Sequence, residues 1–276
     1  MQNVNGPVLS PWVRRFFAIV ALIVIFGAGL LILPGVVQPR WPWTITPFNA
    51  AFLGGVYLSE LVLVLVVIAN NRWSPGRLII PMSLCFVTVV TVVSVLWLGK
   101  FDAGKWSVPA WFIAYVGSIL LIGYYFLKYR NLPPANPAPP PASWRLLLLI
   151  QGILLVLYGL GLLLLPATFS SFWPWKIDQP GSALHAQMYS AVFLTGGLGS
   201  LLLSRAAAPA EYLTLGVTEI ALGLLSIVGM ALVDANLKKI NWFAPGTILW
   251  LAIFAVIFGI GVGLVLKSRS SQSAAG

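Results

Sequence analysis

An internal repeat is the feature that most constrains the fold of this chain. The triplet Trp41-Pro42-Trp43 returns as Trp173-Pro174-Trp175, an offset of 132 residues (173 minus 41). No gap is needed between the matching positions, and rare residues carry much of the match. A tandem duplication explains such self-similarity, so both halves are predicted to fold into the same unit. Other pairs at this offset are Trp12 and Trp144, Gly27 and Gly159, Gly29 and Gly161, Pro34 and Pro166, Tyr57 and Tyr189, and Asp102 and Asp234.

The composition places each repeat in a membrane. Hydrophobic residues make up 59% of the chain and charged residues only 8%, whereas a soluble domain carries about 25% charged residues. Most of the surface is therefore predicted to face the lipid bilayer. The net charge of +10 does not indicate a nucleic-acid partner, because the basic residues stand one or two at a time between apolar segments.

Eight apolar stretches are long enough to cross a hydrocarbon core of roughly 30 Å as helices. Backbone groups in lipid must be hydrogen-bonded within the segment, which favours helices over any open structure. We predict an all-α integral membrane protein with eight transmembrane helices arranged as two parallel four-helix repeats. The predicted spans are residues 16–33, 48–69, 78–98, 108–127, 146–165, 183–203, 212–233 and 244–266.

The domain organisation follows from the repeat and the spans. Residues 1–130 form the first four-helix repeat and residues 144–267 the second. Between them, residues 131–143 contain six prolines, which favour an extended cytoplasmic linker. The small and polar residues 268–276 are predicted to be a disordered tail.

The basic residues predict cytoplasmic termini. Eight spans place both termini on one side, and the 16 Lys and Arg residues divide ten to six in favour of that side, as the positive-inside rule requires of a cytoplasmic face. The ten are Arg14, Arg15, Arg72, Arg77, Lys128, Arg130, Arg145, Arg205, Lys267 and Arg269.

The repeated Trp-Pro-Trp segments form the first outer loop of each half. Pro34 and Pro166 are expected to stop the preceding helices, and the next helices are expected to begin at Thr46-Pro47 and at residues 178–180. One interpretation makes the tryptophans interface anchors in the headgroup layer. The other makes the loops line an outer vestibule, with candidate residues Trp41, Trp43, Trp173, Trp175 and His185. A single imidazole such as that of His185 is more often merely solvated.

Two glutamates inside apolar spans, Glu60 and Glu219, are the candidate functional acids. A carboxylate at membrane depth costs on the order of 3 kcal/mol on insertion scales, so such residues usually face the interior and often carry function. The structural alternative is a hydrogen bond to a neighbouring helix, for example through Ser59 or Thr218. The duplicated Asp102 and Asp234 have lysines nearby, which indicates surface ion pairs.

Small residues four apart predict close helix packing. One such face is Ala51, Gly55 and Ser59, and others are Ala183, Ala191, Thr195 and Gly199 in the second half and Gly259 and Gly263 in the last span.

The chain contains few side chains that could act in catalysis or bind a metal. The chain has six carboxylates, one histidine and one cysteine, so no zinc cluster, haem ligand pair or hydrolase triad can be assembled. We expect no catalytic residues, no metal, no cofactor and no enzymatic activity.

The pattern Trp-Pro-Trp, Thr-Pro and Ala at residues 41–51, repeated in part at residues 173–183, resembles uncharacterised bacterial multipass membrane proteins with a repeated Trp-Pro-Trp segment. That resemblance implies a location in the cell inner membrane and carries no assigned activity.

Two hypotheses for function remain open. In the first, the protein binds or transports a small, apolar or cationic solute between two pseudo-symmetric bundles. In the second, it is a non-transporting membrane assembly, sensory or envelope-stress component. A polar cavity between the halves favours the first hypothesis, and a tightly packed interior favours the second. A weaker third possibility is a lipid-modifying enzyme that uses Glu60 or Asp102. The sequence does not indicate an oligomeric state.

Overall fold

The computed structural model describes residues 8–132, 140–178, 181–205 and 208–273, and the protein is 82% helical. Eight helices in these ranges are long and apolar enough to span a membrane, and no strand is present there, so the predicted all-α multipass fold is confirmed. The first four are α1 (Pro11–Ile32), α3 (Pro47–Asn70), α4 (Trp73–Leu96) and α5 (Ser107–Tyr129). The second four are α6 (Ala142–Leu164), α8 (Leu184–Arg205), α9 (Pro209–Leu237) and α10 (Pro245–Ser273).

Proline ends the first helix of each half at the same place. α1 and α6 stop where Leu33 and Leu165 leave helical geometry, with φ of −134° and −130°. Pro34 and Pro166 cannot continue the preceding hydrogen-bond ladder, and they begin the short helices α2 (Pro34–Val37) and α7 (Pro166–Phe169). The helix breaks expected at both prolines are confirmed.

Two helices of the second half begin at residues other than those predicted. α8 begins at Leu184, not at residues 178–180, of which 179 and 180 lie outside the described residues. Asp178 still acts as its cap, because its carboxylate accepts the backbone N–H groups of His185 (2.9 Å) and Ala186 (3.0 Å). α6 begins at Ala142, inside the predicted linker, whose residues 133–139 are not described.

The predicted disordered tail is wrong as far as Ser273. α10 continues to that residue, and the Ser268 hydroxyl donates to the carbonyl oxygen of Pro209 at 2.7 Å, so the start of the tail packs on α9. Residues 274–276 lie outside the described ranges.

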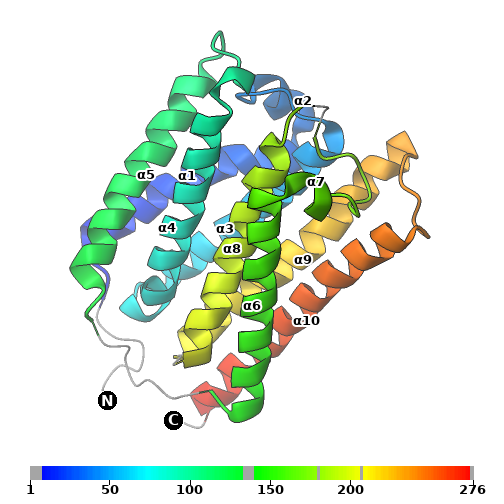
Figure 1. Ribbon diagram of the computed structural model, residues 1–276. Helices are drawn as coiled ribbons and strands as arrows, with labels where there is room; N and C mark the ends of the chain where they lie inside the picture. The colour runs from blue at the N-terminus through cyan, green and yellow to red at the C-terminus, as the bar shows by residue number, and fades with distance from the viewer. Residues whose placement is uncertain (1–7, 133–139, 179–180, 206–207, 274–276) are drawn as a thin grey trace.

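Helices from the two halves are interleaved. One row runs α1, α3, α9 and α10, and the other runs α6, α8, α4 and α5, because these neighbours make the most extensive contacts. The consecutive helices α3 and α4 barely touch each other, and the same holds for α8 and α9. Figure 1 shows α6 beside α8 and α9 beside α10, with α2 and α7 at the same end of the molecule. Each row therefore takes two helices from each half, and the halves are not separate bundles.

Glycines bring the paired helices together. A Cβ atom on Gly54 would lie 2.4 Å from the backbone nitrogen of Leu31, so α1 and α3 touch through their backbones. In the second half, a Cβ atom on Gly197 of α8 would lie 2.8 Å from the carbonyl oxygen of Gly152 on α6. A glycine thus allows close backbone contact in both equivalent helix pairs, α1 with α3 and α6 with α8.

Two of the three predicted small-residue faces lie at contacts between the halves, and the third lies within the second half. A Cβ atom on Gly55 would lie 3.3 Å from Leu225 of α9, and one on Gly199 would lie 2.8 Å from Met82 of α4. Gly263 meets the ring of Trp144. The prediction is wrong for Gly259, because nothing lies within 4 Å of a Cβ atom built there.

We predict that Gly54→Ala destabilises the fold, since the added methyl group has no room against the α1 backbone. Overpacking of this kind costs about 1–3 kcal/mol, measurable as a lower free energy of unfolding in mixed micelles. Gly117→Ala is the matched control, because open space surrounds that position on α5. Equal stability of the two variants would contradict the close α1–α3 contact.

Candidate functional site

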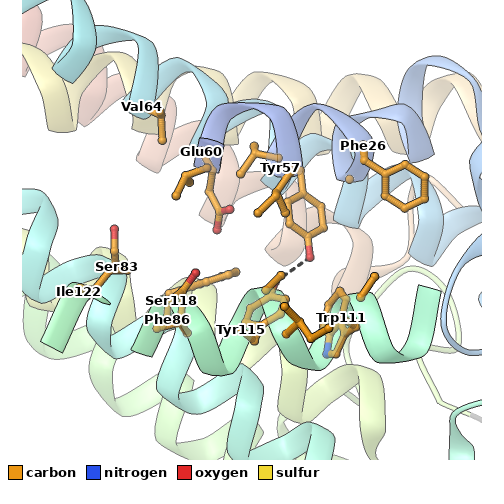
Figure 2. A pocket seen from close by; sticks show the side chains of 18 of the residues that line it. Phe26, Tyr57, Glu60, Val64, Ser83, Phe86, Trp111, Tyr115, Ser118 and Ile122 are labelled. Carbon is orange, nitrogen blue, oxygen red and sulfur yellow. Dashed lines mark hydrogen bonds between the residues drawn. The ribbon is translucent and has the colours of Figure 1, made fainter. Parts of the chain in front are cut away.

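A pocket of about 610 Å³ lies in the first half. α1 and α3 form one wall, α4 and α5 form the other, and Thr195 of α8 reaches it from the second half. Figure 2 shows side chains of these helices converging on the space between them. Most lining residues are aliphatic or aromatic, so the pocket suits an apolar occupant.

The pocket is elongated along the spans. On α5 and the residue before it, the lining runs from Trp106 to Ile122, which corresponds to roughly 24 Å at 1.5 Å per residue. Toward the end of the molecule that carries the Trp-Pro-Trp loops, which we call the outer end, the lining is rich in aromatic rings, including Trp41, Trp106 and Trp111. Toward the opposite end, called the inner end, it reaches Phe16. A chain-like molecule therefore fits its shape.

The pocket opens on the lipid-facing surface between α1 and α5. Among its lining residues, Ile113 of α5 is 74% exposed and Ile23 of α1 is 42% exposed. Two aromatic contacts bridge α1 to α5 and the residue before it: Phe16 with Tyr125 near the inner end (6.2 Å between ring centroids) and Phe26 with Trp106 near the outer end (5.9 Å). The opening between these pairs faces the hydrocarbon layer.

Glu60 points into this pocket from α3 (Figure 2). Its carboxyl group makes no hydrogen bond or ion pair with any described residue. The partner suggested for it, Ser59, instead donates to the carbonyl oxygen of Val56 at 2.7 Å. An intramembrane carboxyl group without a protein partner is free to interact with an occupant of the pocket.

Hydroxyl groups from α3, α4 and α5 line the same pocket as Glu60. Tyr57 and Tyr115 join α3 to α5 through a 2.8 Å hydrogen bond between their hydroxyl oxygens. Ser83 of α4 and Ser118 of α5 line the pocket and have no hydrogen-bond partner among the described residues. These groups make the middle of an otherwise apolar pocket polar.

Two further polar groups stand at the outer end of the pocket. The indole nitrogen Nε1 of Trp41 and the hydroxyl of Ser107 are buried, and neither has a partner among the residues described. Buried donors without partners are costly, so a ligand that accepts their hydrogen bonds is stabilised there.

The four loop tryptophans are buried, not exposed in the headgroup layer. Trp41 and Trp43 are each 2% exposed, and their rings meet edge to face at 5.4 Å. Trp173 and Trp175 repeat this contact at 5.1 Å. The interface-anchor interpretation is wrong for these residues, because the rings pack on one another and on α3, α5, α8 and α10.

Each loop reaches across to the other half. Trp43 donates its indole N–H to Nε2 of His185 on α8 at 3.0 Å, and Trp175 donates to Oδ1 of Asn49 on α3 at 2.9 Å. Asn49 also donates to the carbonyl oxygen of Ile177 at 2.7 Å. These reciprocal bonds fasten the outer ends of the two halves together.

His185 is a structural residue and not a solvated one. Because Trp43 can only donate, Nε2 of His185 accepts, and Nδ1 faces Oδ1 of Asp178 at 3.0 Å as the donor. Of the five candidate vestibule residues, Trp41 lines the pocket, whereas the other three tryptophans and His185 contribute to packing. The loops therefore form a packed cap at the outer end of the molecule and not an open vestibule.

Glu219 lies outside the pocket. Gln151 of α6 donates from Nε2 to its Oε1 at 2.6 Å, and both side chains are buried. The suggested partner Thr218 bonds instead to the carbonyl oxygen of Thr214. No hydrogen bond or ion pair joins Glu219 to Glu60. Glu219 is thus hydrogen-bonded to a neighbouring helix, as the structural alternative expected, but its partner is Gln151 and not Thr218.

The duplicated aspartates differ in their contacts. Asp102 makes the predicted ion pair with Lys105, at 3.9 Å. The prediction is wrong for Asp234, whose carboxylate accepts the backbone N–H groups of Lys239 (2.7 Å) and Ile240 (2.8 Å) and the indole N–H of Trp242. Asp234 therefore shapes the turn between α9 and α10.

Sequence reasoning missed three polar residues that join separate helices and loops of the fold: Asn49, Gln151 and Glu211. Glu211 at the start of α9 binds Arg77 of α4 through both oxygens at 2.7 and 2.8 Å. Each lies in or beside an apolar segment, which was a usable signal, but the sequence does not reveal their partners on distant helices.

Comparisons with known proteins give no match for this chain. No family model, no curated protein and no solved structure matches the chain. Within the described residues, no group of three or more His, Cys, Asp or Glu side chains could hold a metal ion. The geometry of the pocket is therefore the basis for inferring function.

We predict that Trp43→Phe lowers the free energy of unfolding by about 1 kcal/mol, because one buried hydrogen bond is lost. His185→Phe removes the same hydrogen bond. The double variant should therefore lose less unfolding free energy than the sum of the two single variants, and a double-mutant cycle measures this coupling. Trp12→Phe is the control, since Trp12 is 69% exposed. Strict additivity of Trp43→Phe and His185→Phe would contradict the bond.

We predict that Gln151→Leu destabilises the protein by about 1–3 kcal/mol, because Glu219 is left buried without its donor. Adding Glu219→Leu should restore much of this stability, since both polar partners are then replaced by apolar groups. Chemical denaturation of the single and double variants measures the effect. A double variant no more stable than Gln151→Leu would show that Glu219 has another role.

Proposed function

We propose that this protein binds a small, largely apolar solute, which it takes from the lipid bilayer into the pocket of its first half. The observation that carries the proposal is the lateral opening between α1 and α5, bordered by Ile23 and Ile113. A solute dissolved in hydrocarbon reaches this opening without crossing water. The pocket volume of about 610 Å³ lies in the usual range for small-molecule sites.

The extensive packing between the halves argues against a mechanism in which two bundles rock against each other around a solute. Interleaved helix rows connect the halves along the spans, and the reciprocal bonds of Trp43 and Trp175 connect them at the outer end. The proposed solute therefore occupies a space within the first half, and not a space between two bundles.

Movement of the solute between leaflets is a second candidate function. The lining of the pocket extends over roughly 24 Å of α5 at 1.5 Å per residue, which is most of a hydrocarbon core of roughly 30 Å. A solute that slides along this path changes its depth in the membrane while it remains inside the protein.

We further propose a bacterial inner-membrane location with cytoplasmic termini, and a tandem duplication as the origin of the chain. The ten-to-six distribution of basic residues supports the orientation. The likeness of residues 41–51 to bacterial multipass proteins supports the location. The equal order of equivalent helices in the two rows supports the duplication.

Binding is testable with 10-bromodecanol, because bromine quenches the fluorescence of tryptophans that it touches. We predict saturable quenching in purified protein in lipid nanodiscs, since Trp41, Trp106 and Trp111 line the pocket. Ala114→Phe, which fills the pocket from α5, should abolish the saturable component. Gly117→Phe on the same helix is the control, because Gly117 does not line the pocket. Quenching that rises without saturation, or equally in both variants, would contradict the proposal.

The orientation is testable by labelling single cysteines in a Cys85→Ala background. Gly35→Cys and Gly104→Cys lie at the outer end and should react with an impermeant maleimide in intact cells. Leu132→Cys at the inner end should react only after the cells are opened. The reverse pattern would place the termini outside.

A further inference from the structure

The pocket contains one carboxyl group in an otherwise apolar and hydroxyl-lined space. Among its lining residues, Glu60 alone belongs to the Asp, Glu, Lys and Arg set. An isolated charge in an apolar environment is costly unless it is paired. The ionised form of Glu60 therefore needs a cationic partner, which the described protein residues do not supply and a cationic ligand would.

Nearby cationic side chains are engaged elsewhere. Lys105 at the outer end donates to the carbonyl oxygen of Trp41 at 2.9 Å and pairs with Asp102. Lys128 near the inner end of α5 stays with Tyr124, and Arg77 pairs with Glu211. None of the three lines the pocket.

We propose that the solute is a lipophilic cation whose positive group lies beside Glu60 and whose apolar body extends along the pocket. This inference rests on the proposed binding function and adds the charge of the ligand to it. An ion pair in a low-dielectric pocket, without competing protein cations, discriminates strongly between charged and neutral ligands of the same size.

Aromatic rings beside Glu60 favour the same ligand. Tyr57 and Tyr115 stand next to the carboxyl group in Figure 2, and the ring of Trp111 lies 4.3 Å from that of Tyr115 between centroids. Aromatic faces attract cations, and they do so most for weakly hydrated ammonium groups. A carboxyl group flanked by such rings selects an alkylated amine over a strongly hydrated metal ion.

The elongated shape limits the body of the ligand. An alkyl or aryl chain can run toward Phe16 and Ile122 at the inner end or toward Trp41 and Trp106 at the outer end. The lateral opening admits such a chain directly from the bilayer. The ligand class is therefore a single-headed amphipathic amine or quaternary ammonium compound.

Three probes with the same brominated ten-carbon chain test the charge: 10-bromodecyltrimethylammonium, 10-bromodecanol and 10-bromodecanoate. Saturable tryptophan quenching is measured in nanodiscs and corrected for partitioning into protein-free nanodiscs. The wild-type protein should bind the cation at least about tenfold more tightly than the alcohol, and the carboxylate most weakly. Glu60→Gln should remove this preference while the alcohol still binds.

Glu219→Gln is the matched control, because it changes the other intramembrane acid, which lies outside the pocket, and it should keep the cation preference. Glu60→Asp keeps the charge and should keep the preference in part, which provides a second variant if Glu60→Gln does not fold. Equal affinity for cation and alcohol in the wild type, or a preference that survives Glu60→Gln, would overturn the inference. In those cases saturable binding of the alcohol still upholds the proposed function, whereas loss of saturable binding for all three probes rejects both.

Discussion

Lipid offers no hydrogen-bond partner, and the polar groups of this protein must therefore find partners within it. The structure meets part of this requirement with hydrogen bonds between separate helices and loops, two of which link the halves. Trp43 bonds to His185, Trp175 bonds to Asn49, and Glu219 bonds to Gln151. Each bond lies where an unpaired group would be costly, and the first two join segments that are distant in sequence. Of the two intramembrane glutamates, Glu219 has a hydrogen-bond donor in Gln151, whereas Glu60 lies in the pocket and has no partner among the described residues.

The two halves use the corresponding space differently. At an offset of 132 residues, Glu219 corresponds to Val87, which lines the pocket of the first half. In the second half this position carries a side chain that is bonded across to α6. Gly216 and Gly261 also let α9 and α10 approach each other closely, whereas the equivalent residues on α4 and α5 are Leu84 and Tyr129. In agreement with this difference, α4 and α5 make less extensive contacts than α9 and α10.

The sequence predicts the spans well, because span length and hydropathy are local properties. The helix ends at Pro34 and Pro166 are local for the same reason. The interleaving of the halves is not predictable from these patterns, since a small-residue face such as Ala51 and Gly55 does not specify its partner. Tryptophan presents a similar limit, because a Trp near a span end fits both an interface anchor and a packed core. Only the partners of Trp41 and Trp43 in the fold distinguish the two, and the inward position of Glu60 follows from the cost of exposing it to lipid.

The bond from Trp43 to His185 joins residues 142 positions apart, and this separation has a consequence for biosynthesis. Chains grow at about 5–20 residues per second, so Trp43 emerges roughly 7–28 seconds before its acceptor exists. During that interval the first half sits in the membrane with its outer loop incomplete. The ring of Trp43 packs on Phe101 and Trp111, which belong to the first half, so only its indole N–H group lacks a partner until α8 with His185 is inserted.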